Sequence, residues 1–164
     1  MKTISIPVAE FCEACLDVPA FLACCRACGN YGARWSCPPF EFEPEALWTR
    51  YTTLLLCEEK VERPKPPRVA EAKRRMTDEL FALEAQHPGS LALSPGMCDI
   101  CGDDCTRSSG QPCRHPDKMR YSIEALGGNL EKAAVLYFGD PLRWATPDGK
   151  LPEYYLLLGG LLIP

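Results

Sequence analysis

Hydrophobic residues recur with the spacing of a strand in some segments and of a helix in others. Tyr51–Cys57 is β-branched and apolar, which predicts a buried strand. In Arg68–Gln86 the apolar residues recur every three or four positions, which predicts an amphipathic helix. Ser90–Ser94 (SLALS) then predicts a short strand. This order of strand, helix and strand predicts a right-handed βαβ crossover.

Shorter elements flank this unit. The pattern predicts strands at Thr3–Ile6 and Tyr154–Ile163 and helices at Val18–Cys28 and Asn129–Tyr137. Further signals are Pro7 at a first helical turn, Ser122 as an N-cap, Gly127-Gly128 as a stop, and Gly159-Gly160 as a bulge or close backbone approach. Together they predict an α/β fold with a small mixed sheet and flanking helices, forming a single metal-binding domain over residues 1–164.

Two segments lack either spacing and are rich in cysteine. The first cysteine loop is CRACGNYGARWSCPP, Cys25–Pro39, and the second cysteine loop is Pro95–Pro116. The chain has eleven cysteines in 164 residues, an odd number that cannot all pair within one chain. We expect both segments to be metal loops, presented at one end of the sheet.

Composition narrows the compartment and the partners. A formal net charge of -4 leaves no basic footprint for nucleic acid. The N-terminus lacks the apolar core of a secretory signal, and the longest apolar run, Tyr154–Pro164, is shorter than the roughly 20 residues of a membrane span. We therefore expect a cytoplasmic protein that binds neither nucleic acid nor a membrane. In a reducing compartment, clustered cysteines bind metal or perform redox chemistry more often than they form structural disulfides.

The second cysteine loop contains a complete set of four thiolate ligands, Cys98, Cys101, Cys105 and Cys113. Zinc accepts four thiolates, but structural zinc sites usually join two CxxC pairs across a longer loop. The close spacing here is typical of ferredoxin-type runs, although it departs from their standard pattern. It favours an iron–sulfur cluster, of the 4Fe-4S type, over zinc. The implied role is electron transfer or redox work with a partner protein, and the zinc alternative implies an interaction module.

The first cysteine loop provides three ligands, Cys25, Cys28 and Cys37. Either the fourth position stays open, or another cysteine fills it; the candidates are Cys12, Cys15, Cys24 and Cys57. The spacing Cys12-x2-Cys15-x8-Cys24 repeats that of the first loop, which we interpret as coincidence or as auxiliary thiols. Cys57 ends an apolar strand and is expected to be a core thiol.

Other residues near the cysteines have possible roles. Arg34 and Arg114 can balance the charge of thiolate-bound metal, His115 can be a ligand or proton donor, and Tyr31 and Trp35 can shield the first site. In the zinc hypothesis, Trp35, Phe40 and Phe42 are candidate contact residues. A thiol-redox enzyme using Cys25 and Cys28 is a third hypothesis. No GxSxG, P-loop or dinucleotide fingerprint occurs, so whether the protein is an enzyme stays open.

The motifs of both loops resemble those of an uncharacterised prokaryotic family of predicted metal-binding, cysteine-rich proteins. The matching residues are the CxxC of Cys25 and Cys28, Asn30-Tyr31-Gly32, Trp35, Cys37-Pro38-Pro39, the second-loop cysteines with Pro112-Cys113-Arg114, and Ser122–Gly127 (SIEALG). The resemblance covers most of the chain and implies metal binding. Family members usually continue with Gly-Ile-Asp-Val, where this chain has Gly127-Gly128-Asn129-Leu130 and so lacks the aspartate.

Overall fold

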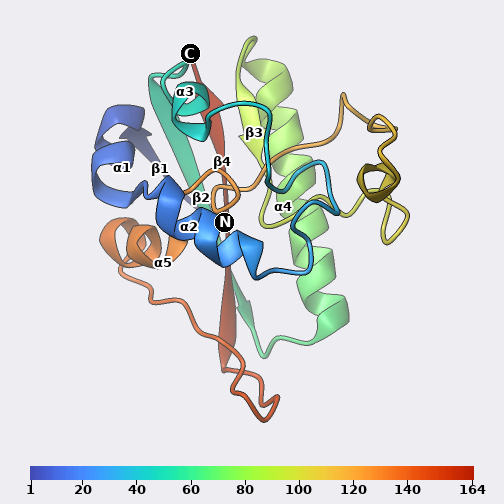
Figure 1. The fold of residues 1–164 in the computed structure, drawn as a ribbon. Helices are drawn as coiled ribbons and strands as arrows, with labels where there is room; N and C mark the ends of the chain where they lie inside the picture. The colour runs from blue at the N-terminus through green and yellow to red at the C-terminus, as the bar shows by residue number, and fades with distance from the viewer.

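In the computed structural model, which describes residues 1–164, a four-stranded sheet has helices on both faces (Figure 1). The elements in chain order are β1 Lys2–Pro7, α1 Val8–Cys15, α2 Val18–Arg26, α3 Pro44–Trp48, β2 Thr53–Glu62, α4 Pro66–Gln86, β3 Leu91–Leu93, the 3-10 helix η1 Thr106–Ser109, α5 Leu130–Ala133, the π-helix η2 Ala134–Phe138 and β4 Tyr154–Ile163. The predicted α/β class with flanking helices is confirmed.

The strand order is β1-β2-β4-β3, and every neighbouring pair is antiparallel. β2 and β3 both pair antiparallel with β4, so they run parallel to each other, as a strand–helix–strand unit requires. They do not touch, because β4 arrives from the far end of the chain and lies between them. This insertion makes the sheet antiparallel throughout, where the sequence predicted a mixed one.

Each face of the sheet buries a different set of side chains, because successive residues of a strand point to opposite faces. On one face, Leu54 of β2 and Leu158 of β4 pack in a core with Phe11 of α1. On the other face, Leu161 packs with Met76 of α4. Burying one such side chain contributes about 1.5–3 kcal/mol, so these contacts fix the layers.

Gly159 and Gly160 are sites of close approach in β4. A Cβ at Gly159 would lie 2.8 Å from the carbonyl oxygen of Leu93, and one at Gly160 would lie 2.9 Å from Leu54 Cδ1. The register between β2 and β4 runs without interruption through both glycines. The predicted close approach is therefore confirmed, and there is no bulge.

The predicted helices and strands appear with small changes at their ends. The segment after Ser122 is a turn and not a helix. Its first residue still caps it, since Ser122 Oγ accepts a hydrogen bond from the Ala125 amide at 3.2 Å. Gly127 then adopts a φ of 89° and ends the turn, which leaves too few residues for a helix.

The second cysteine loop follows the edge strand β3 and projects beside α4 (Figure 1). The first cysteine loop follows α2 and passes next to the second cysteine loop. No helix in the structure combines the length and apolar character that a membrane crossing requires.

Candidate metal centre

The four cysteines of the second cysteine loop line one chamber with a volume of about 20 Å³. Glycines shape the loop: Gly96, Gly102 and Gly110 have φ values of 85°, 53° and 68°, which side chains other than glycine rarely adopt. The remaining walls are formed by Arg34, Trp35, Ser36, Ile100, His115 and Met119. The four predicted ligands of this loop thus line a common chamber with His115, but their side chains are not close enough to one another to hold a single ion.

The first cysteine loop forms part of this chamber. Ser36 is 1% exposed, and its Oγ accepts a hydrogen bond from the Cys98 amide at 3.0 Å. Trp35 Nε1 donates to Thr106 Oγ1 at 3.3 Å. Trp35, which we expected to shield the first site, therefore covers the second.

Two arginines join the loops to each other. Arg107 Nη1 donates to the carbonyl oxygens of Arg34 at 3.1 Å and Cys37 at 2.7 Å, and Nη2 donates to that of Pro39. In the opposite direction, Arg34 donates to the Gly102 carbonyl and forms an ion pair with Asp103 at 3.4 Å. Guanidinium groups suit this role because they present several donors in a fixed plane. Sequence reasoning assigned Arg34 a charge-balancing role and overlooked Arg107.

Within each loop, neighbouring thiols raise the pKa of at least one cysteine. Burial raises the pKa of Cys98, and the neighbouring Cys113 and Cys101 raise it further, while the backbone amide of Ile100 opposes the shift. Burial also raises the pKa of Cys25, and the nearby thiols of Cys37 and Cys28 raise it further by smaller amounts. The protonated thiol is therefore favoured at Cys98 and at Cys25. A cation bound among them would reverse this preference, because metal ligation deprotonates thiols.

Glu124 lies beside the first cysteine loop and was missed as a site residue. Its Oε2 is buried without a hydrogen-bond partner. Burial raises the pKa of Glu124, and the nearby Ser122 and Lys73 oppose the shift. The turn that carries Glu124 is held against the start of α2, where the Asp17 amide donates to the Gly127 carbonyl at 2.9 Å. Glu124 in turn contributes to the raised pKa of Cys25. The one available sequence signal was an acid among apolar neighbours, SIEALGG.

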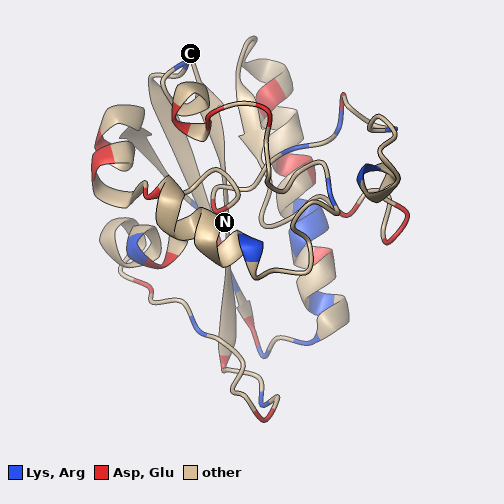
Figure 2. Cartoon of the chain, in the orientation of Figure 1, with Lys and Arg blue, Asp and Glu red and all other residues tan.

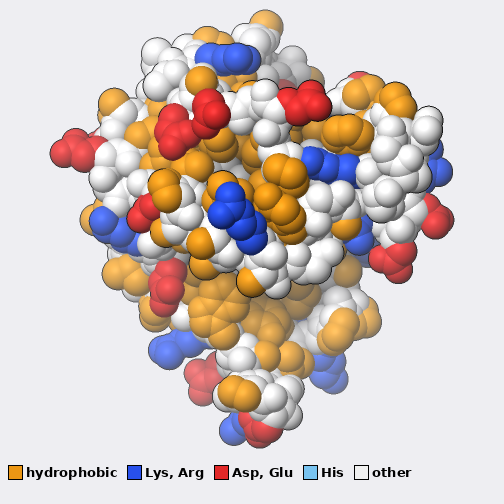
Figure 3. Space-filling view, viewed as in Figure 1, with side chains coloured by type: hydrophobic (Ala, Val, Ile, Leu, Met, Phe, Trp, Pro, Cys, Tyr) orange, Lys and Arg blue, Asp and Glu red, His pale blue; other side chains and the backbone are white.

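Glu124 also lines an apolar recess of about 480 Å³ together with Leu130, Trp144 and Leu158. Figure 3 shows hydrophobic side chains gathered in a hollow on this face of the molecule. Trp144 at its rim is 70% exposed. Glu124 thus lies next to this recess and also close enough to Cys25 of the first loop to affect its pKa.

The other four cysteines lie outside the two loops. Cys57 is fully buried on β2 beneath α4, and burial raises its pKa to about 11, which confirms the predicted core thiol. Cys15 is buried on α1, Cys12 is half-buried on the same helix, and Cys24 is exposed on α2. The repeated spacing therefore does not repeat a structure, because one triplet spans two helices and the other spans a helix end and a loop.

All eleven cysteines are free thiols. No three His, Cys, Asp or Glu side chains are gathered closely enough to hold one metal ion.

Phe40 and Phe42, the other candidate contact residues of the zinc hypothesis, stack on each other with ring centres 4.9 Å apart and pack against the core. They belong to the packing of the fold more than to its surface.

Neither the curated proteins nor the solved structures include a protein that matches this chain. One family model matches residues 10–162, and its description is "Predicted metal-binding protein (DUF2284)". The match includes both cysteine loops, the Glu124 turn and all but the first residues of the fold. The chain therefore belongs to the DUF2284 family of predicted metal-binding proteins.

Proposed function

We propose that the protein binds an iron–sulfur cluster through Cys98, Cys101, Cys105 and Cys113 and transfers electrons to or from a partner protein. The observation that carries the proposal is that these four thiols line a single chamber. Four closely spaced thiolates are the usual protein ligands of such clusters. A bound cluster would supply reversible one-electron transfer, and the chain would set its potential through charge, hydrogen bonds and solvent access.

The residues around the chamber suit that task. Trp35, Ile100 and Met119 form apolar walls that limit water. Arg34 brings a positive charge to the same wall, and Arg114 donates to the Asp104 carbonyl within the loop. The free volume is small, so cluster binding requires the loop to widen. Gly102 and Gly110 favour such movement, since no atom lies within 4 Å of a Cβ placed at either.

Cys25, Cys28 and Cys37 are proposed as a second, incompletely ligated metal site of the same protein. Their mutual effect on the pKa of Cys25 supports their closeness. Asn30 holds the Cys28 side chain in place, because its backbone amide and its side-chain nitrogen donate hydrogen bonds to the Cys28 sulfur at 3.5 and 3.7 Å. Among the thiols considered earlier for the fourth position, Cys15 and Cys57 are buried in the core. Cys24 and Glu124 both affect the pKa of Cys25, Cys24 more strongly, so they are the better-placed candidates.

Zinc is the second candidate, and one observation favours it. A chamber of about 20 Å³ has room for a single ion, whereas a cluster needs more space. In that case the two loops would form a zinc-stabilised interaction module. The thiol-redox alternative gains no support, since an attacking thiol needs a lowered pKa and that of Cys25 is raised.

Metal and sulfide analysis of anaerobically purified protein tests the proposal. We expect a brown protein with broad absorbance near ~400 nm and about four irons and four sulfides for each complete site. Cys98→Ser should remove most of the iron. Cys57→Ala is the matched control, because its thiol is buried away from both loops, and should leave the iron unchanged. A colourless protein with zinc and no sulfide would establish the zinc module instead.

A further inference from the structure

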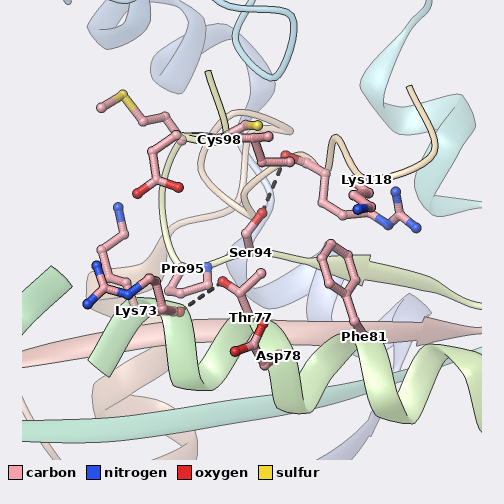
Figure 4. Close-up of a pocket in the computed structure, with 13 residues that line it drawn as sticks. Lys73, Thr77, Asp78, Phe81, Ser94, Pro95, Cys98 and Lys118 are labelled. Carbon is pink, nitrogen blue, oxygen red and sulfur yellow. Dashed lines mark hydrogen bonds between the residues drawn. The ribbon is translucent and has the colours of Figure 1, made fainter. Parts of the chain in front are cut away.

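A groove of about 410 Å³ separates α4 from the second cysteine loop (Figure 4). From α4 it is lined by Lys73, Arg74, Thr77, Asp78 and Phe81. Ser94, Pro95, Met97, Cys98, Asp99, Ile100, Lys118 and Arg120 line it from the opposite side. Ligand pockets of small molecules commonly have volumes of about 300–1,000 Å³, so the groove has room for a metabolite-sized molecule.

Cations outnumber acids four to two in this groove, in a protein whose net charge is -4. Figure 2 colours Lys and Arg positions blue, and they occupy a stretch in the middle of α4. Arg120 is already paired with Glu84 at 2.6 Å. Lys73, Arg74 and Lys118 form no ion pair, so their charges are available to a ligand, although that of Lys73 also acts on Glu124 in the neighbouring recess.

The neutral polar groups of the groove are already engaged. Thr77 Oγ1 donates to the Lys73 carbonyl at 2.8 Å, and Ser94 Oγ donates to the Arg120 carbonyl at 3.3 Å. Phe81, Met97 and Ile100 provide apolar surface. The groove therefore offers cationic donors together with an apolar wall, a combination that suits an anion attached to a hydrocarbon body.

The groove adjoins the candidate metal centre through shared residues. Cys98 and Ile100 line both the groove and the cysteine chamber. The Cys98 backbone is fixed by its hydrogen bond to Ser36. A molecule in the groove would lie next to a proposed metal ligand.

We propose that this groove binds a small organic anion, a carboxylate or a phosphate with an apolar body, next to Cys98. The anionic group would pair with Lys73, Arg74 and Lys118, and its body would contact Phe81 and Ile100. The inference rests on the proposed function in one respect, because it makes this anion the substrate or effector of a redox centre. The binding itself requires no particular metal.

Calorimetric titration of the metal-loaded full-length protein tests the proposal with phenylacetate, phenyl phosphate and the neutral benzyl alcohol. We expect one-to-one binding of at least one anion, weakened by added salt, and no binding of the alcohol. The preferred anion distinguishes a carboxylate from a phosphate ligand. Arg74→Gln should weaken binding about tenfold or more, because it removes a charge-assisted hydrogen bond. Lys118→Gln, on the opposite wall, should also weaken it.

Arg75→Gln is the matched control, since Arg75 is the next residue of α4 but pairs with Glu59 outside the groove. Binding should be unchanged in this variant. Absence of anion binding, or equal binding in Arg74→Gln and the unsubstituted protein, would overturn the proposal. So would a loss of metal from Arg74→Gln with unchanged anion affinity, because the cations would then serve the metal centre alone. Metal analysis of the same samples shows separately whether the proposed iron–sulfur function fails.

Discussion

Replacing Arg107 with lysine should free the first cysteine loop from the second. Arg107 is half-buried and donates to three carbonyl oxygens of the first loop, those of Arg34, Cys37 and Pro39. Its guanidinium also lies 5.1 Å from the centre of the Trp35 ring. Lysine keeps the charge, but its compact ammonium cannot reproduce the planar fork or the stacking.

The expected effect follows from the lost hydrogen bonds. A hydrogen bond from a charged donor contributes about 1.5–3 kcal/mol. Suppose that lysine keeps one of the three hydrogen bonds, and that partial exposure had already weakened the two that are lost. The free energy that holds the first loop closed then falls by about 2–4 kcal/mol. The Cys37 amide donates to the Arg34 carbonyl at 3.1 Å within this loop and reports its opening. Its hydrogen exchange should become roughly 30- to 700-fold faster, at about 1.4 kcal/mol for each factor of ten.

Hydrogen exchange measured by NMR or mass spectrometry checks this effect. Arg114→Lys is the matched control, because Arg114 donates to Asp104 inside its own loop and does not touch the first. That variant should leave exchange at Cys37 unchanged. Unchanged exchange in Arg107→Lys, or equal acceleration in both variants, would show that the guanidinium does not hold the loops together.

Three further predictions concern stability and reactivity. Glu124→Gln should stabilise the protein by about 1–3 kcal/mol at pH 7, since it removes an ionisable group whose Oε2 is buried without a partner and whose charged form burial disfavours. Because burial raises the pKa of Glu124 above its usual value of 4.5, the gain should disappear near pH 4, where both states are protonated; a gain independent of pH would contradict this cause. Gly159→Ala should destabilise the fold by about 1–3 kcal/mol or more in urea unfolding, whereas Gly29→Ala, with open space around it, should cost far less; similar losses would refute the close approach at Gly159. Alkylation with iodoacetamide, mapped by mass spectrometry, should modify exposed Cys24 and spare buried Cys57 in the folded protein, and prompt labelling of Cys57 would contradict its burial.

Local sequence patterns predicted the elements of the fold because their causes lie within a few residues. The apolar stripe of α4 and its end at Gln86 follow from helical spacing, whereas the helix begins at Pro66, two residues before the predicted start at Arg68. β4 matches its predicted bounds, Tyr154–Ile163, because an apolar run of that length suits a buried strand. The grouping of Cys98, Cys101, Cys105 and Cys113 was likewise readable, since one short loop contains them all. The seven cysteines of the two loops stay predicted ligands.

What the sequence determined by itself was therefore the four strands, the longer helices and the two groups of thiols, but not the short helix α3. The tertiary structure decided how distant segments meet: β4 lies between β2 and β3, Trp35 covers the chamber of the second loop, and Glu124 lies beside the first. Arg107 and the Cys37 carbonyl that it binds are 70 positions apart along the chain. Such contacts leave no periodic trace in the sequence, because they depend on how whole layers pack and on which polar groups remain without partners inside them.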